Sequence, residues 1–380
     1  MRDPIYLDHN ATTPLLPEAL DAMLPYLRGR YGNSSSQHAY GQTARKAVEH
    51  ARGQVASLIG ASPDEIVFTS GGTESNNLAV RGAAEAHPDR RHLVTCNVEH
   101  SAIGAVCTWL EGHGYRTTRV PVGPNGRVRA AEAIAALADH TLMVTVMHAN
   151  NETGVLQPVA EIGKAARERG VLVHTDAAQS AGKVKVHVDE LSVDLLSIAA
   201  HKLYGPKGIG ALFIRRGTRL APFALGGTHE RGLRPGTENV PGIVGFGVAC
   251  AAAVRDAEWL EELLGMMRTR LWERLRAQVP GLAMNGDPEG RVPNTLNVRF
   301  PGVTGPALLA AAPEVAASTS AACRDGADVA SAVILAMGVP HEEALGSVRL
   351  SLGRASTDAE IDRAADALAA AWKSLRATSA

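Results

Sequence analysis

Residues 197–210 read Ser-Ile-Ala-Ala-His-Lys-Leu-Tyr-Gly-Pro-Lys-Gly-Ile-Gly, an apolar run that leads into a lysine and then a glycine-rich turn. Residues 171–179, Val-Leu-Val-His-Thr-Asp-Ala-Ala-Gln, follow the same plan, with Asp176 after the apolar run. Short apolar runs bounded by polar or glycine-containing turns are typical of buried parallel strands. Both stretches therefore predict strands that end in chemically active side chains.

The same alternation of apolar runs and helical patterns extends outward over residues 40–215. Helical periodicity predicts helices over 42–59 and 74–86. Strands are predicted over residues 66–69, 92–96, 142–148, 171–175 and 195–199. Strands that alternate with helices indicate an α/β fold in which helices cover both faces of the sheet.

Residues 222–241 interrupt this alternation with a loop rich in glycine and proline, and loops of this length are usually functional. A helical stretch over 242–278, bent or broken, leads from it into a second α/β-like section. We therefore predict a large domain of residues 16–254 and a smaller domain of residues 255–380 that also includes residues 1–15.

Composition excludes several classes of function. The 380 residues include 38 Lys and Arg against 39 Asp and Glu, so a generally basic nucleic-acid-binding surface is not expected. We find no apolar run of membrane-spanning length and no secretory signal, which favours a cytoplasmic protein. The cysteines are too sparse for a disulfide framework, and without CxxC or HExxH patterns no metal site is expected.

Three stretches combine into a candidate site. Residues 69–77, Thr-Ser-Gly-Gly-Thr-Glu-Ser-Asn-Asn, place Gly72 and Thr73 at the start of a helix, where unpaired N–H groups suit a phosphate. Asp176 at a strand end suits a cationic ring nitrogen, and a partly desolvated Lys202 would react with an aldehyde. Singly, these features are more simply explained as a turn, a helix cap and a surface charge. Together they are the three contacts that pyridoxal 5'-phosphate (PLP) requires.

The chain resembles the cysteine desulfurases of the class V aminotransferase-like family nearly from end to end. The motifs that carry the resemblance are YLDHNATTP, GNSSSQHAYG, EIVFTSGGTESNNLAV, VEHSAI, ANNETGVLQP, HTDAAQSAGK, AHKLYGPKGIGAL, ERGLRPGTENVPGIVGFG and SVRLSLGR. The resemblance implies the type I fold of PLP-dependent transferases, with a mainly parallel seven-stranded sheet in the large domain. It also implies a homodimer that converts L-cysteine into L-alanine and passes the sulfur to an acceptor or scaffold protein.

The resemblance further implies roles for individual residues. His100 would stack on the cofactor ring and move protons, although a helix cap is its simpler explanation. Asn151 and Gln179 would contact the phenolic oxygen of PLP, and Asn151 would also orient the substrate. His201 would bind the cofactor phosphate together with Thr237, which in this family comes from the partner subunit.

The sulfur chemistry would depend on three further side chains. Arg354 in SLGR would hold the substrate carboxylate through a bidentate contact. Cys323, on a loop of the small domain, stands where the family carries its nucleophilic cysteine, and its small flanking residues and the adjacent Arg324 favour an accessible thiolate. Lys202 would carry the α-proton while the thiolate attacks the substrate sulfur, which leaves a persulfide on Cys323.

Two departures from the family pattern keep alternatives open. Ala199 stands where the family often has a phosphate-contacting serine, which predicts one missing hydrogen bond. The segment before Cys323 is Ser-Ala-Ala-Cys, without the usual glycine, and it also resembles selenocysteine lyases. A non-catalytic scaffold of a sulfur-relay complex is disfavoured by the intact set of reactive residues, and a plain aminotransferase would not explain Cys323. The acceptor could serve iron–sulfur clusters, thiolated tRNA, thiamine-like cofactors or phosphorothioated DNA.

Overall fold

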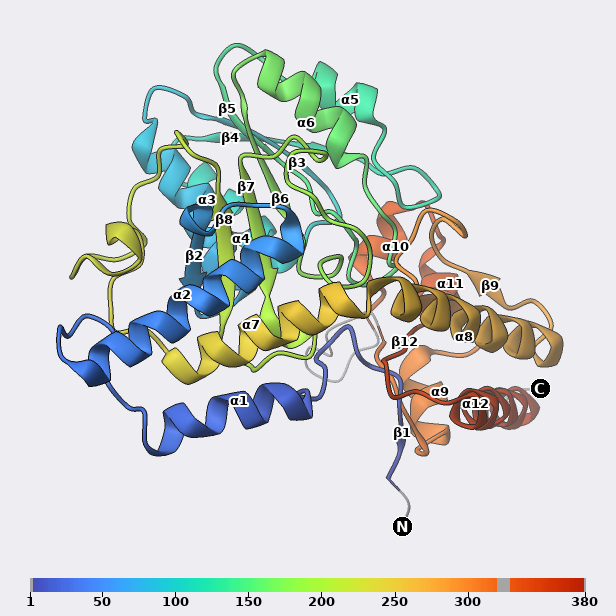
Figure 1. The fold of residues 1–380 in the computed structure, drawn as a ribbon. Helices are drawn as coiled ribbons and strands as arrows, with labels where there is room; N and C mark the ends of the chain where they lie inside the picture. The colour runs from blue at the N-terminus through green and yellow to red at the C-terminus, as the bar shows by residue number, and fades with distance from the viewer. Residues whose placement is uncertain (1–2, 320–328, 379–380) are drawn as a thin grey trace.

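A seven-stranded sheet forms the centre of the computed structural model, which describes residues 3–319 and 329–378 (Figure 1). In spatial order its strands are β2 (Ile66–Thr69), β8 (Gly210–Ile214), β7 (Leu195–Ala199), β6 (Leu172–Asp176), β5 (Thr141–Thr145), β3 (His92–Cys96) and β4 (Arg116–Val120). Neighbouring strands are parallel except at β8, which is antiparallel to both β2 and β7. The mainly parallel sheet and the α/β class are confirmed.

The reversed direction of β8 follows from the length of its connection. Only residues 200–209 link β7 to β8, and they contain just the short helix η2 (Ala200–Lys202). A parallel connection must return along the whole strand and needs about a dozen residues or more. The short link therefore turns the chain back antiparallel, and it holds Lys202 at the end of the sheet.

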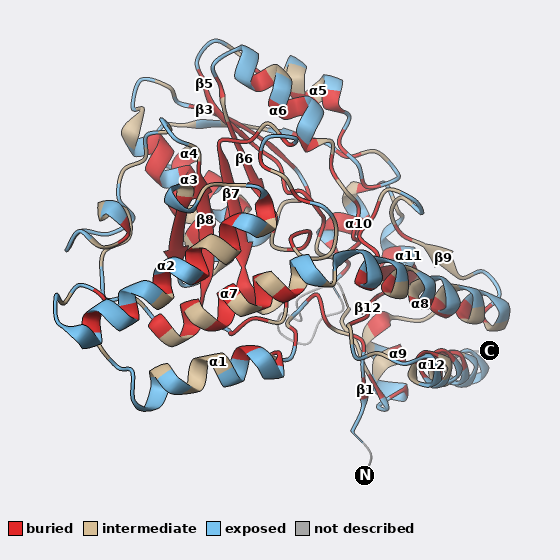
Figure 2. Cartoon of the chain, in the orientation of Figure 1, coloured by how far each residue is buried: buried red, intermediate tan, exposed pale blue. Residues whose placement is uncertain are grey.

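Helices cover both faces of this sheet, as expected. One face packs against α2 (Ala39–Ile59), α5 (Ala130–Ala135), α6 (Val159–Glu168) and α7 (Val240–Arg255), and the other against α3 (Gly72–Ala86) and α4 (Ser101–Glu111). The sides of α2 and α7 that face the sheet are buried (Figure 2). At their crossing a Cβ on Gly247 would lie 2.7 Å from the Ala51 Cα, so glycine permits this close approach. Helix α1 (Pro17–Arg28) lies outside α7 (Figure 1).

A second hydrophobic core lies beside the first. It is built from β1 (Ile5–Tyr6), α8 (Ala257–Gln278), β10 (Thr295–Arg299), α9 (Gly305–Ala311), β11 (Val315–Ala316), β12 (Ser347–Ser351) and α12 (Asp358–Thr378). Strands β12, β10 and β9 (Ala283–Met284) form an antiparallel sheet, and β1 pairs with β11 in parallel. The β1 pairing attaches the N-terminal residues to this second core.

The junction of the two cores lies at Asp256, where α7 and α8 meet at an angle of 75°. We therefore keep the proposed domain division near residue 255, with one amendment. Helices α10 (Ala332–Ala336) and α11 (His341–Ala344) follow the second core in sequence, but Val333, Ile334 and Ala344 belong to the first hydrophobic cluster.

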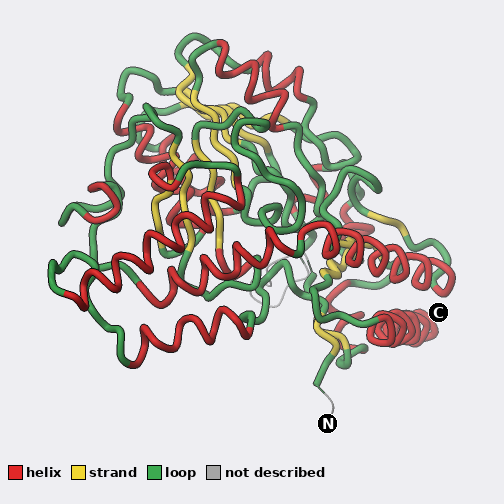
Figure 3. The backbone as a smooth tube through the Cα atoms, viewed as in Figure 1, coloured by secondary structure: helices red, strands yellow, loops and turns green. Residues whose placement is uncertain are grey.

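The loop before α7 has the irregular course that its glycines and prolines predict. Between β8 and α7 the chain runs as loop apart from the short helix η3 (His229–Gly232), as Figure 3 shows. A third short helix, η1 (Pro63–Glu65), precedes β2. Over the described ranges no single helix has both the length and the apolar character to cross a membrane, and α7 and α8 pass that test only together, as a bent pair.

Candidate active site

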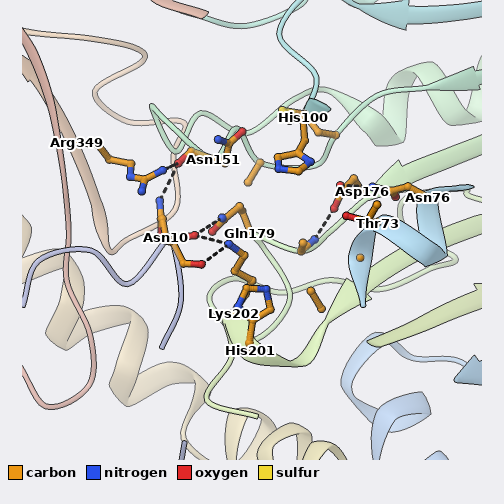
Figure 4. Close-up of a pocket in the computed structure, with 16 residues that line it drawn as sticks. Asn10, Thr73, Asn76, His100, Asn151, Asp176, Gln179, His201, Lys202 and Arg349 are labelled. Atoms are coloured by element: carbon orange, nitrogen blue, oxygen red, sulfur yellow. Dashed lines mark hydrogen bonds between the residues drawn. The ribbon is translucent and has the colours of Figure 1, made fainter. Parts of the chain in front are cut away.

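Polar side chains from both cores line a cavity of about 390 Å³ next to the carboxyl ends of β6 and β7 (Figure 4). Open α/β sheets bind ligands at such strand ends, and the volume is typical of small-molecule and cofactor sites. The predicted site residues that line the cavity are Gly72, Thr73, His100, Asn151, Asp176, Gln179, His201 and Lys202. The structure thus brings together residues that lie far apart in the sequence.

Asp176 presents a fixed carboxylate to this cavity. It is buried at the end of β6, where its Oδ2 accepts a hydrogen bond of 2.7 Å from Asn76 Nδ2 of α3. Its Oδ1 accepts a second bond of 2.9 Å from the backbone N–H of Ala178. A carboxylate held in one orientation in this way suits a cationic ring nitrogen as its partner.

Lys202 presents its amine from the end of β7. Its Nζ donates to the carbonyl oxygens of Asn10, at 2.6 Å, and Ala11, at 2.8 Å. Burial and the nearby Arg349 cation lower the pKa of Lys202 to about 8, against the opposite influence of Asp176 and a second carboxylate. An appreciable fraction of the amine is therefore neutral near neutral pH, as a nucleophile requires.

The start of α3 forms the anion-binding end of the cavity. This helix of 15 residues begins at Gly72, and its first-turn N–H groups have no partner within the helix. Burial and neighbouring lysines lower the pKa of His201 to about 4, so its ring is neutral at physiological pH. Its Nδ1 lies 3.1 Å from Thr12 Oγ1. Ala199 also lines the cavity, and it offers no hydroxyl group there.

His100 caps a helix and also lines the cavity, so its place is compatible with both explanations that the sequence left open. It is the N-cap of α4, where its Nδ1 accepts a hydrogen bond of 3.2 Å from the Ala102 N–H, and its ring also lines the cavity. The tautomer that this contact requires carries its proton on Nε2. In Figure 4 the His100 ring lies across the cavity from Lys202.

The predicted carboxylate-binding arginine requires a correction. Arg354 does not line the cavity, because its guanidinium group pairs with Asp256 at the junction of α7 and α8, and its backbone N–H donates to Tyr204 Oη at 2.8 Å. Arg349, five residues earlier in β12, lines the cavity instead. Strand alternation is the signal that could have found it, since Val348 and Leu350 belong to the second core and Arg349 lies between them.

Arg349 is held in place and still has an unused donor. Its Nη2 pairs with Asp8 Oδ1 at 2.6 Å, and its Nη1 donates to the Asn151 carbonyl oxygen at 3.1 Å. Its Nε is buried and has no hydrogen-bond partner in the described parts of the chain. An unsatisfied charged donor beside a cavity suits an anionic ligand such as a carboxylate.

The roles of two further predicted residues, Thr237 and Cys323, stay predictions. Thr237 is exposed in the loop before α7 and does not line this cavity of the single chain, so its role in a partner subunit stays a prediction. Cys323 lies outside the described residues. The other cysteines, Cys96, Cys107 and Cys250, are buried, and burial raises their pKa, that of Cys107 to about 12.

Comparisons with known proteins identify the family of this chain. A family model described as aminotransferase class-V matches residues 5–364. The chain is 50% identical to a cysteine desulfurase IscS from Anaeromyxobacter dehalogenans (strain 2CP-C) over 370 residues, which covers 96% of this chain and 91% of that protein. A solved NifS-like protein superposes with a TM-score of 0.91 at 35% identity over 97% of this chain and 98% of that chain. A structure of SspA in complex with cysteine gives a TM-score of 0.82 at 34% identity over 91% and 98%, respectively. This chain therefore belongs to the class V aminotransferase family and, within it, to the cysteine desulfurases, a class of PLP-dependent enzymes.

Proposed function

We propose that this chain removes sulfur from L-cysteine, releases L-alanine and hands the sulfur to an acceptor protein from a persulfide on Cys323. The observation that supports this best is the single cavity in which Asp176, Lys202 and the start of α3 lie together. These three groups match the three polar parts of PLP. Its ring nitrogen requires an acid, its aldehyde an amine and its phosphate an anion site.

The residues present fit this cofactor. Lys202 would hold the aldehyde carbon, Asp176 the ring nitrogen, and Gly72, Thr73 and His201 the phosphate. When bound, PLP supplies an electron sink for the negative charge that develops on the substrate Cα. The fixed carboxylate of Asp176 suits this chemistry, because a positive ring nitrogen is stabilised only while its partner stays ionised and in place.

Arg349 would hold the substrate carboxylate, in place of the Arg354 predicted from the sequence. Asp8 and the Asn151 carbonyl fix the plane of its guanidinium group, and its Nε remains available. A guanidinium group presents paired donors in the geometry that a carboxylate needs. The Asn151 side chain lines the same side of the cavity and would orient the substrate (Figure 4).

Protons and sulfur would then move between named atoms. Lys202 Nζ would take the α-proton and return protons to the product carbons, and His100 Nε2 would exchange protons with the thiols. The Cys323 thiolate would attack the substrate sulfur, so that an S–S bond forms as the C–S bond breaks and its electron pair stays with the carbon. L-cysteine and one enzyme thiol thus give L-alanine and one persulfide. A homodimer, in which Thr237 reaches the partner's phosphate site, is part of this proposal.

Replacement of the nucleophile tests the sulfur chemistry. Cys323→Ala should keep bound PLP but lose cysteine-dependent alanine formation by several orders of magnitude, because no thiol remains to accept the sulfur. The measurement is alanine release from L-cysteine and from L-selenocysteine, with Cys107→Ala as the control for a buried cysteine. Selenocysteine turnover that survives in Cys323→Ala, beside poor cysteine turnover in the unmodified protein, would instead favour a selenocysteine lyase.

Covalent labelling tests the cofactor site independently. Borohydride reduction of the PLP-loaded protein followed by peptide mapping should place the label on Lys202. A label on another lysine, or none, would contradict the proposed function.

A further inference from the structure

A second lysine, Lys183, lies just behind the cavity wall. It is half-buried in the turn that follows β6, and its Nζ donates to Gln179 Oε1 at 2.8 Å and to Asn10 Oδ1 at 3.0 Å. No carboxylate of the described chain forms an ion pair with it. The positive charge of this lysine is therefore held by two neutral amide groups.

These contacts determine how both amides are oriented. An ammonium group has three donors and no acceptor, so each amide must present its oxygen to Lys183. The Gln179 Nε2 group then faces away from Lys183 and donates to the Asn10 carbonyl oxygen at 2.9 Å. The Asn10 Nδ2 group donates to Thr295 Oγ1 at 2.8 Å and to the Asn151 carbonyl oxygen at 3.2 Å.

Asn10 connects the oriented Gln179 amide to the reactive amine of Lys202. The carbonyl oxygen that accepts the Gln179 bond also accepts the 2.6 Å bond from Lys202 Nζ, as Figure 4 shows. The backbone N–H of Asn10 is anchored to Ser351 Oγ at 2.9 Å. Lys183, Gln179, Asn10 and Lys202 thus form one connected hydrogen-bond network, and the first of them lies outside the cavity lining.

We propose that Lys183 is a positioning residue for the cofactor site, because its ammonium group holds Gln179 with an N–H donor, not an oxygen, available to the cavity. The inference rests on the proposed function, in which the phenolic oxygen of PLP is the acceptor for that donor. A reversed Gln179 amide would place its oxygen against the negatively charged phenolic oxygen. Lys183 touches neither cofactor nor substrate, so it acts only through the two amides.

The charges around Lys183 determine in which direction its removal shifts the protonation of the nitrogen that joins Lys202 to PLP. Burial and the cations of Lys202 and Arg349 lower the pKa of Lys183, and the two amide oxygens stabilise its charged form. The nearby carboxylates, Asp8 and Asp176, act on Lys202. Removal of the Lys183 charge, and of the donor that it orients, should favour the protonated state of the nitrogen that joins Lys202 to PLP.

The test compares Lys183→Met, Lys183→Arg and the control Lys185→Met, whose lysine is exposed and pairs with Glu190. Two quantities are measured. One is the PLP affinity of the apoprotein, by absorbance titration, and the other is the pH at which the visible absorption band of the PLP-loaded protein is half converted, called the midpoint. We expect Lys183→Met to bind PLP roughly tenfold more weakly and to shift the midpoint to higher pH, because a charge-assisted contact is lost. Lys183→Arg should restore the PLP affinity to within about threefold and return the pH midpoint to its original value. Lys185→Met should change neither quantity.

Unchanged affinity and midpoint in Lys183→Met would overturn the inference alone, as would an Lys183→Arg variant that is equally impaired. Failure of the unmodified protein to take up PLP would instead overturn the proposed function, and the inference with it. Should Lys183→Met not fold, Gln179→Glu provides the second test. It keeps an acceptor for Lys183 but has no N–H donor, so the midpoint should again move to higher pH, and an unchanged midpoint would contradict the inference.

Discussion

Arg349 and Arg354 lie close together in the sequence, but one lines the polar cavity and the other lies at the junction of the two cores. Each pairs with a carboxylate, Arg349 with Asp8 and Arg354 with Asp256. They differ in what remains after that pairing. Arg349 keeps a buried Nε without a partner in the described chain.

The guanidinium group of Arg354 lies beside two aromatic rings and is partly exposed, with 19% of its side chain accessible to solvent. Its carbon lies 5.7 Å from the ring centroid of Tyr204 and 6.0 Å from that of Trp259, within the range of cation–π contacts. Asp256 is also paired with Arg255, so charges on both sides of the α7–α8 junction are neutralised locally. In this pair, the arginine that lines the cavity is the one with a buried donor left unmet, whereas Arg354 is held by contacts at the junction of the two cores.

Substitution of the two arginines is the most direct way to break this comparison. Arg349→Lys should lower kcat/KM for L-cysteine about a hundredfold, because lysine cannot replace a paired donor at a buried carboxylate site. Arg354→Lys should keep kcat/KM within about threefold of that of the unmodified protein and lower Tm by about 2 °C at most, because lysine keeps the charge and only weakens one partly exposed ion pair. Steady-state kinetics and calorimetry give both quantities.

The opposite pattern, with the larger kinetic loss in Arg354→Lys, would restore the role that the sequence first suggested for Arg354. A large loss of Tm in Arg349→Lys would show that its pairing with Asp8 is mainly structural.

Sequence reasoning succeeds best for the buried strands and for the residues at their carboxyl ends. The sequence places Asp176 and Lys202 one or two polar residues after an apolar run, and the carboxyl end of a buried strand is where α/β sheets bind ligands. Strands β3 and β7 are predicted with their observed bounds, since every residue in them is buried. Buried parallel strands have the clearest sequence pattern in this chain.

The misses have equally physical causes. Strand β4 reads Arg-Thr-Thr-Arg-Val at the edge of the sheet, where side chains are exposed and no apolar run is required. Arg349 lies inside a strand and not at its end, so only the alternation of β12 indicates which side it faces. The contact between Asn10 and Lys183 joins residues 173 positions apart, and no local pattern encodes it.

The pH dependence of PLP uptake also distinguishes Arg349 from Arg354, with a smaller expected effect than the kinetic one. The neutral amine of Lys202 reacts with aldehyde, and its pKa is about 8, so the rate of PLP uptake by apoprotein should rise with pH and level off above about 8. Arg349 lowers this pKa, so Arg349→Gln should move the midpoint to higher pH by several tenths of a unit. Stopped-flow absorbance from pH 6 to 10 measures the profile. Arg354→Gln is the matched control, and an equal shift in it would contradict the distinction between the two sites.

The smallest effect is expected at the anion-binding end of the cavity, where this chain has Ala199 and no hydroxyl group. Ala199→Ser should raise PLP affinity a few-fold, because one added hydrogen bond to a phosphate contributes about 1 kcal/mol. A Cβ at position 72 would lie 3.5 Å from the Ala199 Cβ, so the hydroxyl would enter the cradle at the start of α3. Ala200→Ser is the control, since Ala200 belongs to the first hydrophobic cluster, and it should lower Tm without a gain in affinity.

If the added hydroxyl strengthens PLP binding and leaves KM for L-cysteine unchanged, the phosphate end and the Arg349 end act as separate binding regions. A change in KM as large as the change in PLP affinity would show that they do not.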